Sequence, residues 1–244
     1  MKAWQRRDLT IVPANNNCLV IACDSCGAIG FKDGDVFKLP PRYTGKFTAR
    51  VALTEVMCAG AMPVAITNGV SCEMHPTGEE TILGIQEEMQ NANITDIVLT
   101  GSTEENFATS MTALAITVIG TINESDLRFG RADQGDKFIL FGKPFVGSEV
   151  DLESKGFYTE IRQLLQLTEV KEIIPVGSKG VAYEAEILAN LNDAQFLLYK
   201  TEIDYYKSAG PVTCLLILCA ESAVSQVLAI YQQATVIGEI KYGA

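Results

Sequence analysis

The arrangement of strand-like and helical segments constrains the fold of this chain more than any other feature of its sequence. Apolar stretches typical of strands and amphipathic stretches typical of helices are mixed in the first half, and they are mixed again in the second. Neither half has the strict strand–helix alternation that is typical of a doubly wound parallel sheet. We therefore expect an α+β protein of two domains, residues 1–125 and 135–244, separated near 123–135 by a polar, turn-forming stretch.

The first half begins with a predicted β-hairpin. Residues 9–12 and 18–23 have strand character, and the stretch from Pro13 to Asn17 between them has the residues of a turn. The other elements that we expect in this half are a helix over 45–60, a strand over 64–72, a helix over 77–91 with Thr77 as N-cap, and strands over 96–99 and 112–120. In the second half we expect strands over 137–142, 193–198, 212–219 and 236–240, and helices over 150–167, 180–191 and 221–233.

The composition disfavours several classes of protein. The formal net charge is −11, which disfavours contact with nucleic-acid backbones and anionic membranes. Hydrophobic residues make up 48% of the chain, yet no uninterrupted apolar run reaches the roughly 18 residues of a membrane span. The seven cysteines and a start without the apolar core of a secretory signal indicate reduced thiols. We expect a cytoplasmic protein with no nucleic-acid partner and no membrane partner.

Two carboxylates stand in positions where a charge needs an explanation. Asp24 directly follows the apolar stretch 18–23 and precedes a loop rich in small residues, where a carboxylate could reach a metal ion. The alternative is that Asp24 caps a turn through its own backbone. Glu55 lies among Leu53, Val56 and Met57 in the first predicted helix. Its carboxylate is either paired or metal-bound inside the protein, or it simply points to solvent.

The stretch 100–106, Thr-Gly-Ser-Thr-Glu-Glu-Asn, has the residues of a phosphate-contacting turn. It follows a predicted strand, and it offers backbone N–H groups to phosphates and two carboxylates to a magnesium ion. The alternative is a helix N-terminus, with Ser102 or Thr103 as the cap and the two glutamates in the first turn. The two interpretations are compatible.

Other motifs carry less weight. Cys23 and Cys26 form a Cys-x-x-Cys pair, but there is no second pair and His75 is the single histidine, so a four-ligand zinc site is poorly supplied. His75 precedes a proline in a predicted loop, which indicates a solvated side chain rather than a catalytic base. Neither a Walker-type phosphate loop nor Gly-x-Gly-x-x-Gly occurs, so ATP would have to bind by another structure.

The order of these motifs resembles the superfamily of aminoimidazole ribonucleotide synthetase, thiamine-monophosphate kinase, selenophosphate synthetase and the hydrogenase maturation protein E. The segment 54–63, Thr-Glu-Val-Met-Cys-Ala-Gly-Ala-Met-Pro, is similar to that superfamily's Asn-Asp-Leu-Ala-Ala-Met-Gly-Ala-x-Pro. Residues 100–103, Thr-Gly-Ser-Thr, stand where the superfamily has Gly-Gly-Asp-Thr. In the second half, 207–211 (Lys-Ser-Ala-Gly-Pro) and 237–239 (Ile-Gly-Glu) also fit, so the resemblance covers nearly the whole chain.

The resemblance implies a two-domain fold that uses ATP and Mg²⁺, in a homodimer whose N-terminal domains pair to close a β-barrel. It implies metal ligands at Asp8, Asp24 and Glu55. Ser102 replaces the family acid, and Glu104 or Glu105 could restore the missing charge. The residues that would contact the cofactor are Gly101, Ser102, Thr103, Glu104, Glu105 and Asn106. Candidates for phosphate contact are Lys32, Lys38, Arg42 and Lys46, with solvated surface charge as the alternative for each.

The departures from the superfamily pattern resemble one branch of it. The phrases Arg-Asp-Leu-Thr at 7–10, Asp-Ser-x-Gly-x-Ile-Gly at 24–30 and the stretch 100–106 are similar to the alpha-ribazole kinase branch of cobalamin lower-ligand salvage. That branch would transfer the γ-phosphate of ATP to the 5′-hydroxyl of the nucleoside alpha-ribazole. The alternatives are another ATP-dependent ligase, synthetase or kinase reaction of the superfamily, and a nucleotide-binding regulatory protein without turnover. The sequence identifies no catalytic base.

Overall fold

The computed structural model describes residues 2–242, and the chain forms two compact units, each built on its own sheet. The N-terminal unit comprises the chain up to Met57, then Ala61–Asp126 and Leu152–Gly156. The C-terminal unit comprises Cys58–Gly60, Leu127–Asp151 and the chain from Phe157 onward. The short segment Leu152–Gly156 thus packs with the N-terminal unit although the chain on both sides of it belongs to the other.

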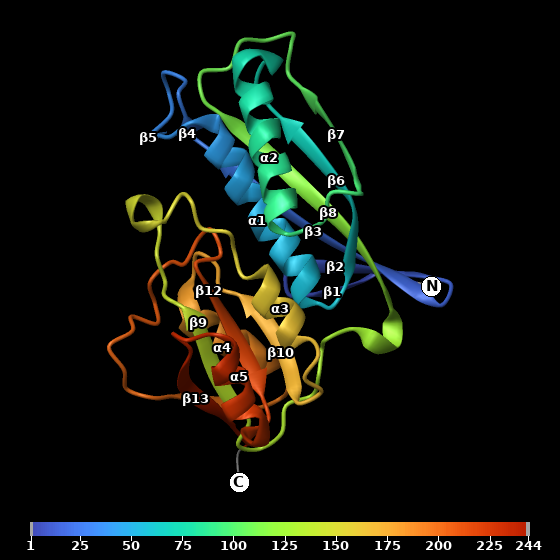
Figure 1. The fold of residues 1–244 in the computed structure, drawn as a ribbon, viewed down its shortest axis with the longest axis vertical. Helices are drawn as coiled ribbons and strands as arrows, with labels where there is room; N and C mark the ends of the chain where they lie inside the picture. The colour runs from blue at the N-terminus through green and yellow to red at the C-terminus, as the bar shows by residue number, and fades with distance from the viewer. Residues whose placement is uncertain (1, 243–244) are drawn as a thin grey trace. The chain divides into compact units, whose positions relative to one another are not determined.

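A six-stranded sheet forms the centre of the N-terminal unit (Figure 1). Its strands, in spatial order, are β1 (Trp4–Arg6), β2 (Leu9–Ala14), β3 (Asn17–Gly27), β8 (Ala113–Asn123), β6 (Met62–Val70) and β7 (Val98–Thr103). Neighbouring strands are antiparallel except β6 and β7, which are parallel and are connected through a helix. A separate two-stranded pair, β4 (Ile29–Gly30) and β5 (Phe37–Lys38), follows β3. The predicted hairpin at residues 9–23 is confirmed as β2 and β3.

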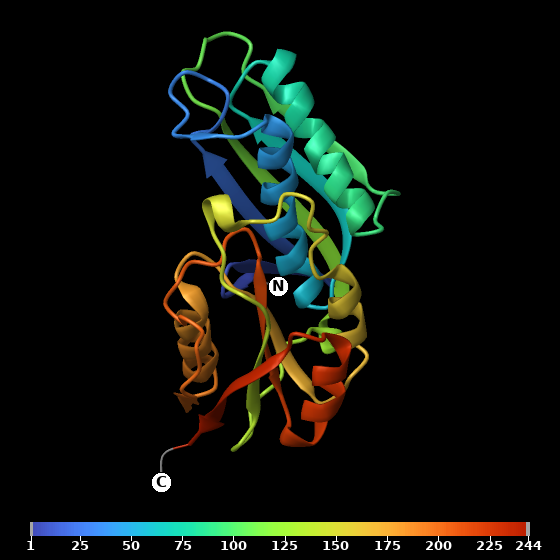
Figure 2. The ribbon, with the colours of Figure 1, turned by 60° about the vertical axis from the view of Figure 1, so that its left-hand side comes forward.

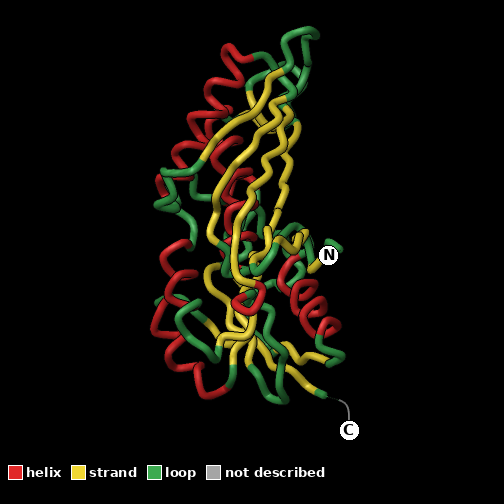
Figure 3. The backbone as a smooth tube through the Cα atoms, turned by 90° about the vertical axis from the view of Figure 1, so that its right-hand side faces the viewer, coloured by secondary structure: helices red, strands yellow, loops and turns green. Residues whose placement is uncertain are grey.

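Helices α1 (Pro41–Cys58) and α2 (Glu79–Asn91) cover one face of this sheet (Figure 3). They approach closely because two glycines face the partner helix's backbone. A Cβ on Gly45 would lie 2.1 Å from the Thr81 carbonyl oxygen, and one on Gly84 would lie 1.8 Å from the Arg42 carbonyl oxygen. Both helices were predicted, but Thr77 is not the N-cap of α2. It lies in a π-helical turn (Met74–Gly78), and Gly78 takes the N-cap position.

The opposite face of the sheet carries no charged side chain on its four main strands, β3, β8, β6 and β7. Side chains alternate between faces along a strand, and the residues on this face are half-buried or exposed in the chain alone. They are Leu19, Ile21, Cys23, Ser25, Ala65, Thr67, Gly69, Val98, Thr100, Ser102, Ala113, Ala115, Thr117, Ile119 and Thr121. The sheet is open in this chain, with β1 and β7 at its edges, so no closed barrel forms within residues 2–242.

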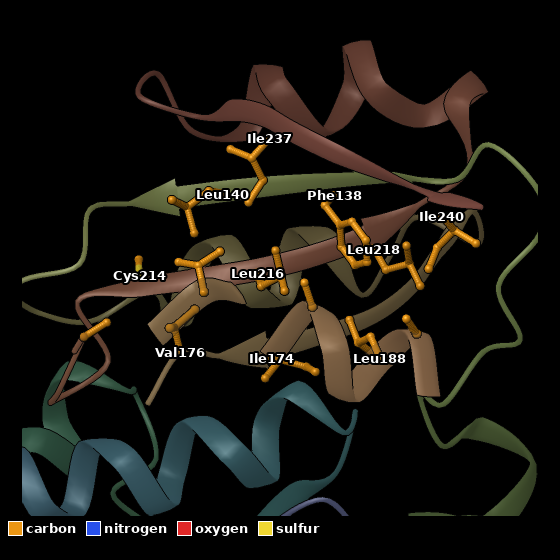
Figure 4. Packing of buried hydrophobic residues seen from close by; sticks show 14 of the residues in the cluster. Phe138, Leu140, Ile174, Val176, Leu188, Cys214, Leu216, Leu218, Ile237 and Ile240 are labelled. Atoms are coloured by element: carbon orange, nitrogen blue, oxygen red, sulfur yellow. The ribbon is translucent and has the colours of Figure 1, made fainter. Parts of the chain in front are cut away.

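The C-terminal unit has a five-stranded antiparallel sheet in the order β10 (Val170–Pro175), β12 (Cys214–Cys219), β9 (Lys137–Gly142), β13 (Thr235–Lys241) and β11 (Gln195–Leu198). Helix α4 (Gly180–Leu191) packs on one face, and α3 (Tyr158–Leu164) and α5 (Val224–Ile230) lie on the other (Figure 2). Phe138, Leu216, Ile174 and Leu188 belong to the apolar core under α4 (Figure 4). Strands β9 and β12 are buried on both faces, which explains their continuous apolar sequences.

Three further predictions of helix and strand bounds were wrong. The strand predicted to end at residue 99 continues to Thr103, since β7 pairs with β6 along its whole length. The helix predicted over 150–167 is reduced to α3, because residues 152–156 pack separately with the N-terminal unit. The helix predicted over 221–233 is a 3₁₀ turn (Glu221–Ala223) followed by the short α5.

Candidate functional site

Asp24 lies within strand β3 rather than at its end, so the predicted strand terminus was wrong. Strand β3 pairs with β8 as far as Gly27, and Asp24 lies opposite Ile116. Alternation along the strand places Asp24 with Val20 and Ala22 on the face covered by the helices. The turn-cap alternative is therefore excluded, because this carboxylate points toward the helical layer.

Glu55 is on helix α1 and is 7% exposed, so the alternative that it points to solvent is wrong. The Arg7 guanidinium donates a hydrogen bond from Nη1 to Glu55 Oε2 at 3.1 Å, and both side chains are nearly inaccessible. Arg7 comes from the turn between β1 and β2, next to the exposed Asp8. Strand β3, helix α1 and this turn therefore bring all three predicted metal-binding carboxylates into one region.

The electrostatics of the three carboxylates show that they interact. Burial raises the pKa of Asp24 to about 6; the Ser25 backbone N–H group lowers it, and the Asp8 carboxylate raises it. Burial also raises the pKa of Glu55, where the Arg7 guanidinium acts in the opposite direction and the carboxylates of Asp8 and Asp24 add to the rise. The region therefore holds more negative charge than Arg7 balances, and a cation would stabilise the ionised carboxylates.

These carboxylates fit a cation that is carried by a phosphate group better than a free-standing metal centre. Among residues 2–242, no three His, Cys, Asp or Glu side chains are grouped tightly enough to hold an ion by themselves. Magnesium usually retains waters and binds through one or two carboxylates together with substrate phosphates. Asp24 and Asp8 would supply such carboxylates, and Glu55 is held by Arg7.

Gly101, Ser102 and Thr103 lie in the edge strand β7, so the predicted turn and the helix-cap alternative were both wrong at these residues. Contact with a phosphate stays a prediction. A Cβ on Gly101 would lie 2.3 Å from the Asn68 carbonyl oxygen, so the neighbouring strand requires glycine here. Asp24, Ile116, Asn68 and Gly101 form one transverse row of the sheet. Because neighbouring strands are spaced by about 4.8 Å, Gly101 is roughly 14 Å from Asp24.

Glu104 and Glu105 have partners of their own in the loop that follows β7. Glu104 accepts hydrogen bonds from the backbone N–H groups of Asn106 and Phe107 at 2.7 and 3.1 Å. Glu105 accepts one from the Met74 N–H group at 2.8 Å and one from Thr103 Oγ1 at 2.7 Å. The structure therefore groups Asp8, Asp24 and Glu55 together, and it places the 101–106 residues apart from them.

A cavity of about 290 Å³ lies in the N-terminal unit, and Gly101, Ser102 and Thr103 line part of it. Its walls are formed by α2, by the strands β6 and β7 and by the turn before α2; the lining residues are Asn68, Met74, Ile82, Gln86, Leu99, Thr100, Gly101, Ser102 and Thr103. Asn68 donates a hydrogen bond from Nδ2 to the Thr100 carbonyl oxygen at 3.2 Å. Sequence reasoning missed Asn68 and Gln86, because nothing in their local sequence distinguishes them from ordinary surface amides.

The four predicted phosphate-contacting cations all have partners within the protein. Lys32 pairs with Glu73 at 2.5 Å, and Lys38 donates to the Lys32 carbonyl oxygen. Arg42 and Lys46 both bind Glu87. Lys46 is 1% exposed, so solvated surface charge does not describe it.

The Cys-x-x-Cys pair lies on strand β3, and the histidine lies in the turn before α2. Cys23 and Cys26 are free thiols, and burial raises the pKa of Cys26 to about 11. His75 is exposed, with Nδ1 3.1 Å from Glu79 Oε2 in the turn before α2.

Residues 7–122 match the family model described as "AIR synthase related protein, N-terminal domain". The matched segment starts at Arg7 and contains Asp8, Asp24, Glu55 and the whole of strand β7. Over these residues the chain is similar to the family that the sequence motifs resemble. No curated protein matches the sequence.

Several solved structures share the fold of nearly the whole chain. The PurL of Thermotoga maritima complexed with ATP matches with a TM-score of 0.70 at 13% identity, over 96% of this chain and 42% of PurL. The E. coli hydrogenase maturation protein HypE matches with a TM-score of 0.70 at 18% identity, over 92% of this chain and 80% of HypE. A chain of a HypE–HypF complex matches with a TM-score of 0.72 at 15% identity, over 96% of this chain and 87% of that chain. The chain thus shares its fold with these proteins, and it spans less than half the length of PurL.

None of the helices in the described part of the chain, residues 2–242, is both long enough and apolar enough to cross a bilayer.

Proposed function

We propose that this protein is an ATP- and Mg²⁺-dependent kinase that phosphorylates the 5′-hydroxyl of alpha-ribazole. The observation that carries the proposal is the group of Asp8, Asp24 and Glu55, three interacting carboxylates whose charge Arg7 balances only in part. It lies in a domain that matches the AIR synthase-related family, and the similar PurL structure is a complex with ATP.

In this proposal the protein contributes mainly position and charge. A divalent cation on the nucleotide neutralises charge that develops on the transferring phosphoryl group. Asp24 and Asp8 would hold that cation, since the Asp8 carboxylate is near enough to raise the pKa of Asp24. Burial makes the ionised form of Asp24 unfavourable without a cation, so this carboxylate favours the state in which the cation is bound. Little covalent help is required for phosphoryl transfer, and no side chain is assigned as a base.

We also propose that two copies of the chain pair through the uncharged face of the N-terminal sheet. That face presents Ile21, Thr117, Ile119 and Val98 among other small or apolar residues, and its four main strands carry no charged group there. A large uncharged sheet face on a monomer is unusual unless it is covered. A second copy, with the same face, would cover it by two-fold symmetry and close the predicted barrel.

The choice of alpha-ribazole as the phosphoryl acceptor rests on the resemblance of short sequence motifs. One of these motifs, at 100–106, changes the number of carboxylates near the proposed nucleotide site. Ser102 stands where the superfamily has an acid, and it lies on β7 with its side chain on the uncharged face. The nucleotide site therefore lacks one carboxylate of the superfamily set. The alpha-ribazole kinase branch is the one whose phrase at 100–106 this sequence resembles.

The test is incubation of the purified chain with alpha-ribazole, ATP and Mg²⁺, followed by mass spectrometry of the nucleoside. We expect alpha-ribazole 5′-phosphate and ADP in equal amounts, and a large loss of both with Asp24→Asn. Asp96→Asn, at an exposed acid in the loop before β7, is the matched control. Unchanged nucleoside at high enzyme concentration would overturn the kinase proposal. Consumption of ATP without nucleoside phosphate would favour another reaction of the superfamily, and stabilisation by MgATP without any turnover would favour a regulatory protein.

A further inference from the structure

The cavity beside the edge strand β7 takes no part in the carboxylate chemistry proposed above. Alternation along β7 directs the side chains of Leu99 and Thr103 toward the helical layer, and both residues line the cavity. Gly101 lies between them and faces the same way without a side chain. Glycine is required there, since a Cβ would overlap the carbonyl oxygen and the side chain of Asn68. The strand pairing that requires glycine thus also reduces this wall of the cavity to backbone atoms.

The volume and the lining of the cavity indicate what it can hold. The volume is about 290 Å³, whereas about 150 Å³ is enough for a benzene molecule in an engineered protein cavity. The cavity therefore accommodates a flat system of two fused rings, and the rest of a larger ligand would extend outside it. None of the lining residues is charged, so the cavity offers no counter-charge to a phosphate group. It fits an uncharged ring.

Two amide side chains line the cavity, and one of them is buried. Asn68 is 8% exposed, and its Nδ2 donates a hydrogen bond to the Thr100 carbonyl oxygen at 3.2 Å, which fixes the orientation of the amide. Its Oδ1 lies next to Gly101, where it can accept a hydrogen bond from a ligand. Gln86, on α2, adds a donor and an acceptor near the solvent. These groups match the nitrogen atoms along the edge of a heteroaromatic base.

The apolar walls of the cavity come from three segments of the N-terminal unit. Ile82 is on α2, Leu99 is on β7, and Met74 is in the π-helical turn before α2. Glu105 joins the turn to the strand, because its carboxylate accepts hydrogen bonds from the Met74 N–H group at 2.8 Å and from Thr103 Oγ1 at 2.7 Å. The walls are thus held in place without a ligand, which lowers the entropy that binding costs.

We propose that this cavity binds the uncharged heteroaromatic ring of a nucleoside, with the faces of the ring against the apolar walls and its edge toward the amides of Asn68 and Gln86. The inference rests on the proposed function, which involves two such rings, the base of ATP and the base of alpha-ribazole. Because Gly101 is roughly 14 Å from Asp24, the ring binds apart from the cation.

Isothermal titration calorimetry with adenosine, with alpha-ribazole, and with inorganic triphosphate and Mg²⁺ separates the ring from the phosphates. Ile82→Phe fills the cavity from the side of α2. We expect this variant to bind at least one of the two nucleosides tenfold or more weakly than the wild type, and to bind triphosphate unchanged, because triphosphate has no ring. Leu83→Phe is the matched control, at a neighbouring residue that is 53% exposed and outside the lining. The nucleoside that is lost identifies the source of the ring.

Two further variants keep the test decisive if Ile82→Phe does not fold. Asn68→Leu retains the size of the side chain and removes the buried amide, and Gln86→Leu changes an exposed side chain of α2. Both should weaken the binding of the same nucleoside. The inference is overturned if the wild type binds neither nucleoside, if the cavity variants bind both as tightly as Leu83→Phe does, or if triphosphate binding falls by the same factor.

These measurements do not require turnover, so they are independent of the kinase assay. A chain that binds alpha-ribazole in the cavity but leaves it unphosphorylated would refute the kinase proposal and not this inference. A chain that phosphorylates alpha-ribazole, while Ile82→Phe binds both nucleosides like the wild type, would refute this inference alone.

Discussion

Helix α1 carries buried charges in two places, and their surroundings differ. In the first half of the helix, Arg50 makes a two-point contact with Glu88, at 2.7 Å from Nε and 3.1 Å from Nη2. It also donates to the Ser154 hydroxyl at 2.8 Å and to the Ser154 carbonyl oxygen. In the second half, Glu55 pairs with the Arg7 guanidinium and is repelled by the carboxylates of Asp8 and Asp24.

The difference separates buried charge that is fully paired from buried charge that is balanced only in part. Lys46 and Arg50 are matched by Glu87, Glu88 and the backbone of 152–156, so this network has no need of a further ion. It holds the segment 152–156 in the N-terminal unit. A buried network with all partners in place stabilises one arrangement, whereas an incompletely balanced group is unfavourable until something binds. The carboxylate region is of the second kind.

The largest effect on stability should come from Arg50→Ala. This variant leaves Glu88 ionised and without its principal partner in the interior, which should lower the free energy of unfolding by about 3–5 kcal/mol. Urea denaturation measures the change, with Arg131→Ala as an exposed control. Replacing both partners, as Arg50→Met with Glu88→Leu, should restore most of the loss. A loss below about 1 kcal/mol for Arg50→Ala would show that the network is not the structural element that we describe.

Asp24→Asn should lower the activity and leave the stability unchanged or higher, in contrast to Arg50→Ala, which lowers the stability. If the proposed function holds, kcat/KM for alpha-ribazole should fall by about 10²–10³-fold, because the carboxylate that we propose to hold the cation is lost. The free energy of unfolding should stay the same or rise, because the substitution removes a buried charge that two neighbouring carboxylates repel. Steady-state kinetics and urea denaturation of one preparation test both parts. A strongly destabilised variant would contradict the distinction between the two regions.

Asp35 provides an intermediate case, a buried carboxylate that is fully hydrogen-bonded. It accepts bonds from Thr112 N at 2.7 Å, from Thr112 Oγ1 at 2.7 Å and from Lys32 N at 2.8 Å. Burial alone would raise the pKa of Asp35, but these donors lower it below its ordinary value. Because the folded-state pKa is the lower one, the stabilisation is present at neutral pH and is lost as the pH falls below about 4.

Asp35→Asn should therefore lower the free energy of unfolding by about 1–3 kcal/mol at pH 7. The difference from the wild type should shrink as the pH falls through the acidic range, where the wild-type carboxyl also becomes neutral. Urea denaturation at pH 7 and near pH 3 gives the comparison. A difference that grows at acidic pH would mean that the sign of the pKa shift is wrong.

The smallest effect should come from Arg42→Gln. Arg42 and Lys46 bind the same partner, Glu87, but the Arg42 side chain is 55% exposed and that of Lys46 is 1% exposed. Solvent screens the outer pair, so the melting temperature should change by less than about 2 °C. Lys46→Gln should lower it by more, because it removes the buried partner of Glu87 and the contact with the Leu152 carbonyl oxygen. Differential scanning calorimetry of the two variants tests whether burial rather than the pairing itself sets the contribution.

The sequence by itself determined the elements whose information is local. The turn residues from Pro13 to Asn17 specified a hairpin, the helical spacing of apolar residues specified α1 and α2, and the run 137–142 specified the buried strand β9. The set of Asp8, Asp24 and Glu55 came from the resemblance to a superfamily, because a carboxylate next to apolar residues has no local signal that distinguishes pairing from exposure.

Only the tertiary structure decided which charges meet. The β3–β8 pairing places Asp24 within a strand, and the β6–β7 pairing extends β7 through Gly101 and Ser102 to Thr103, because hydrogen-bonding partners come from segments distant in the chain. Arg7 and Glu55 are 48 residues apart, and Arg50 and Ser154 are 104 apart. Local patterns cannot register such contacts, since the energy of a buried charge depends on the groups that surround it after folding.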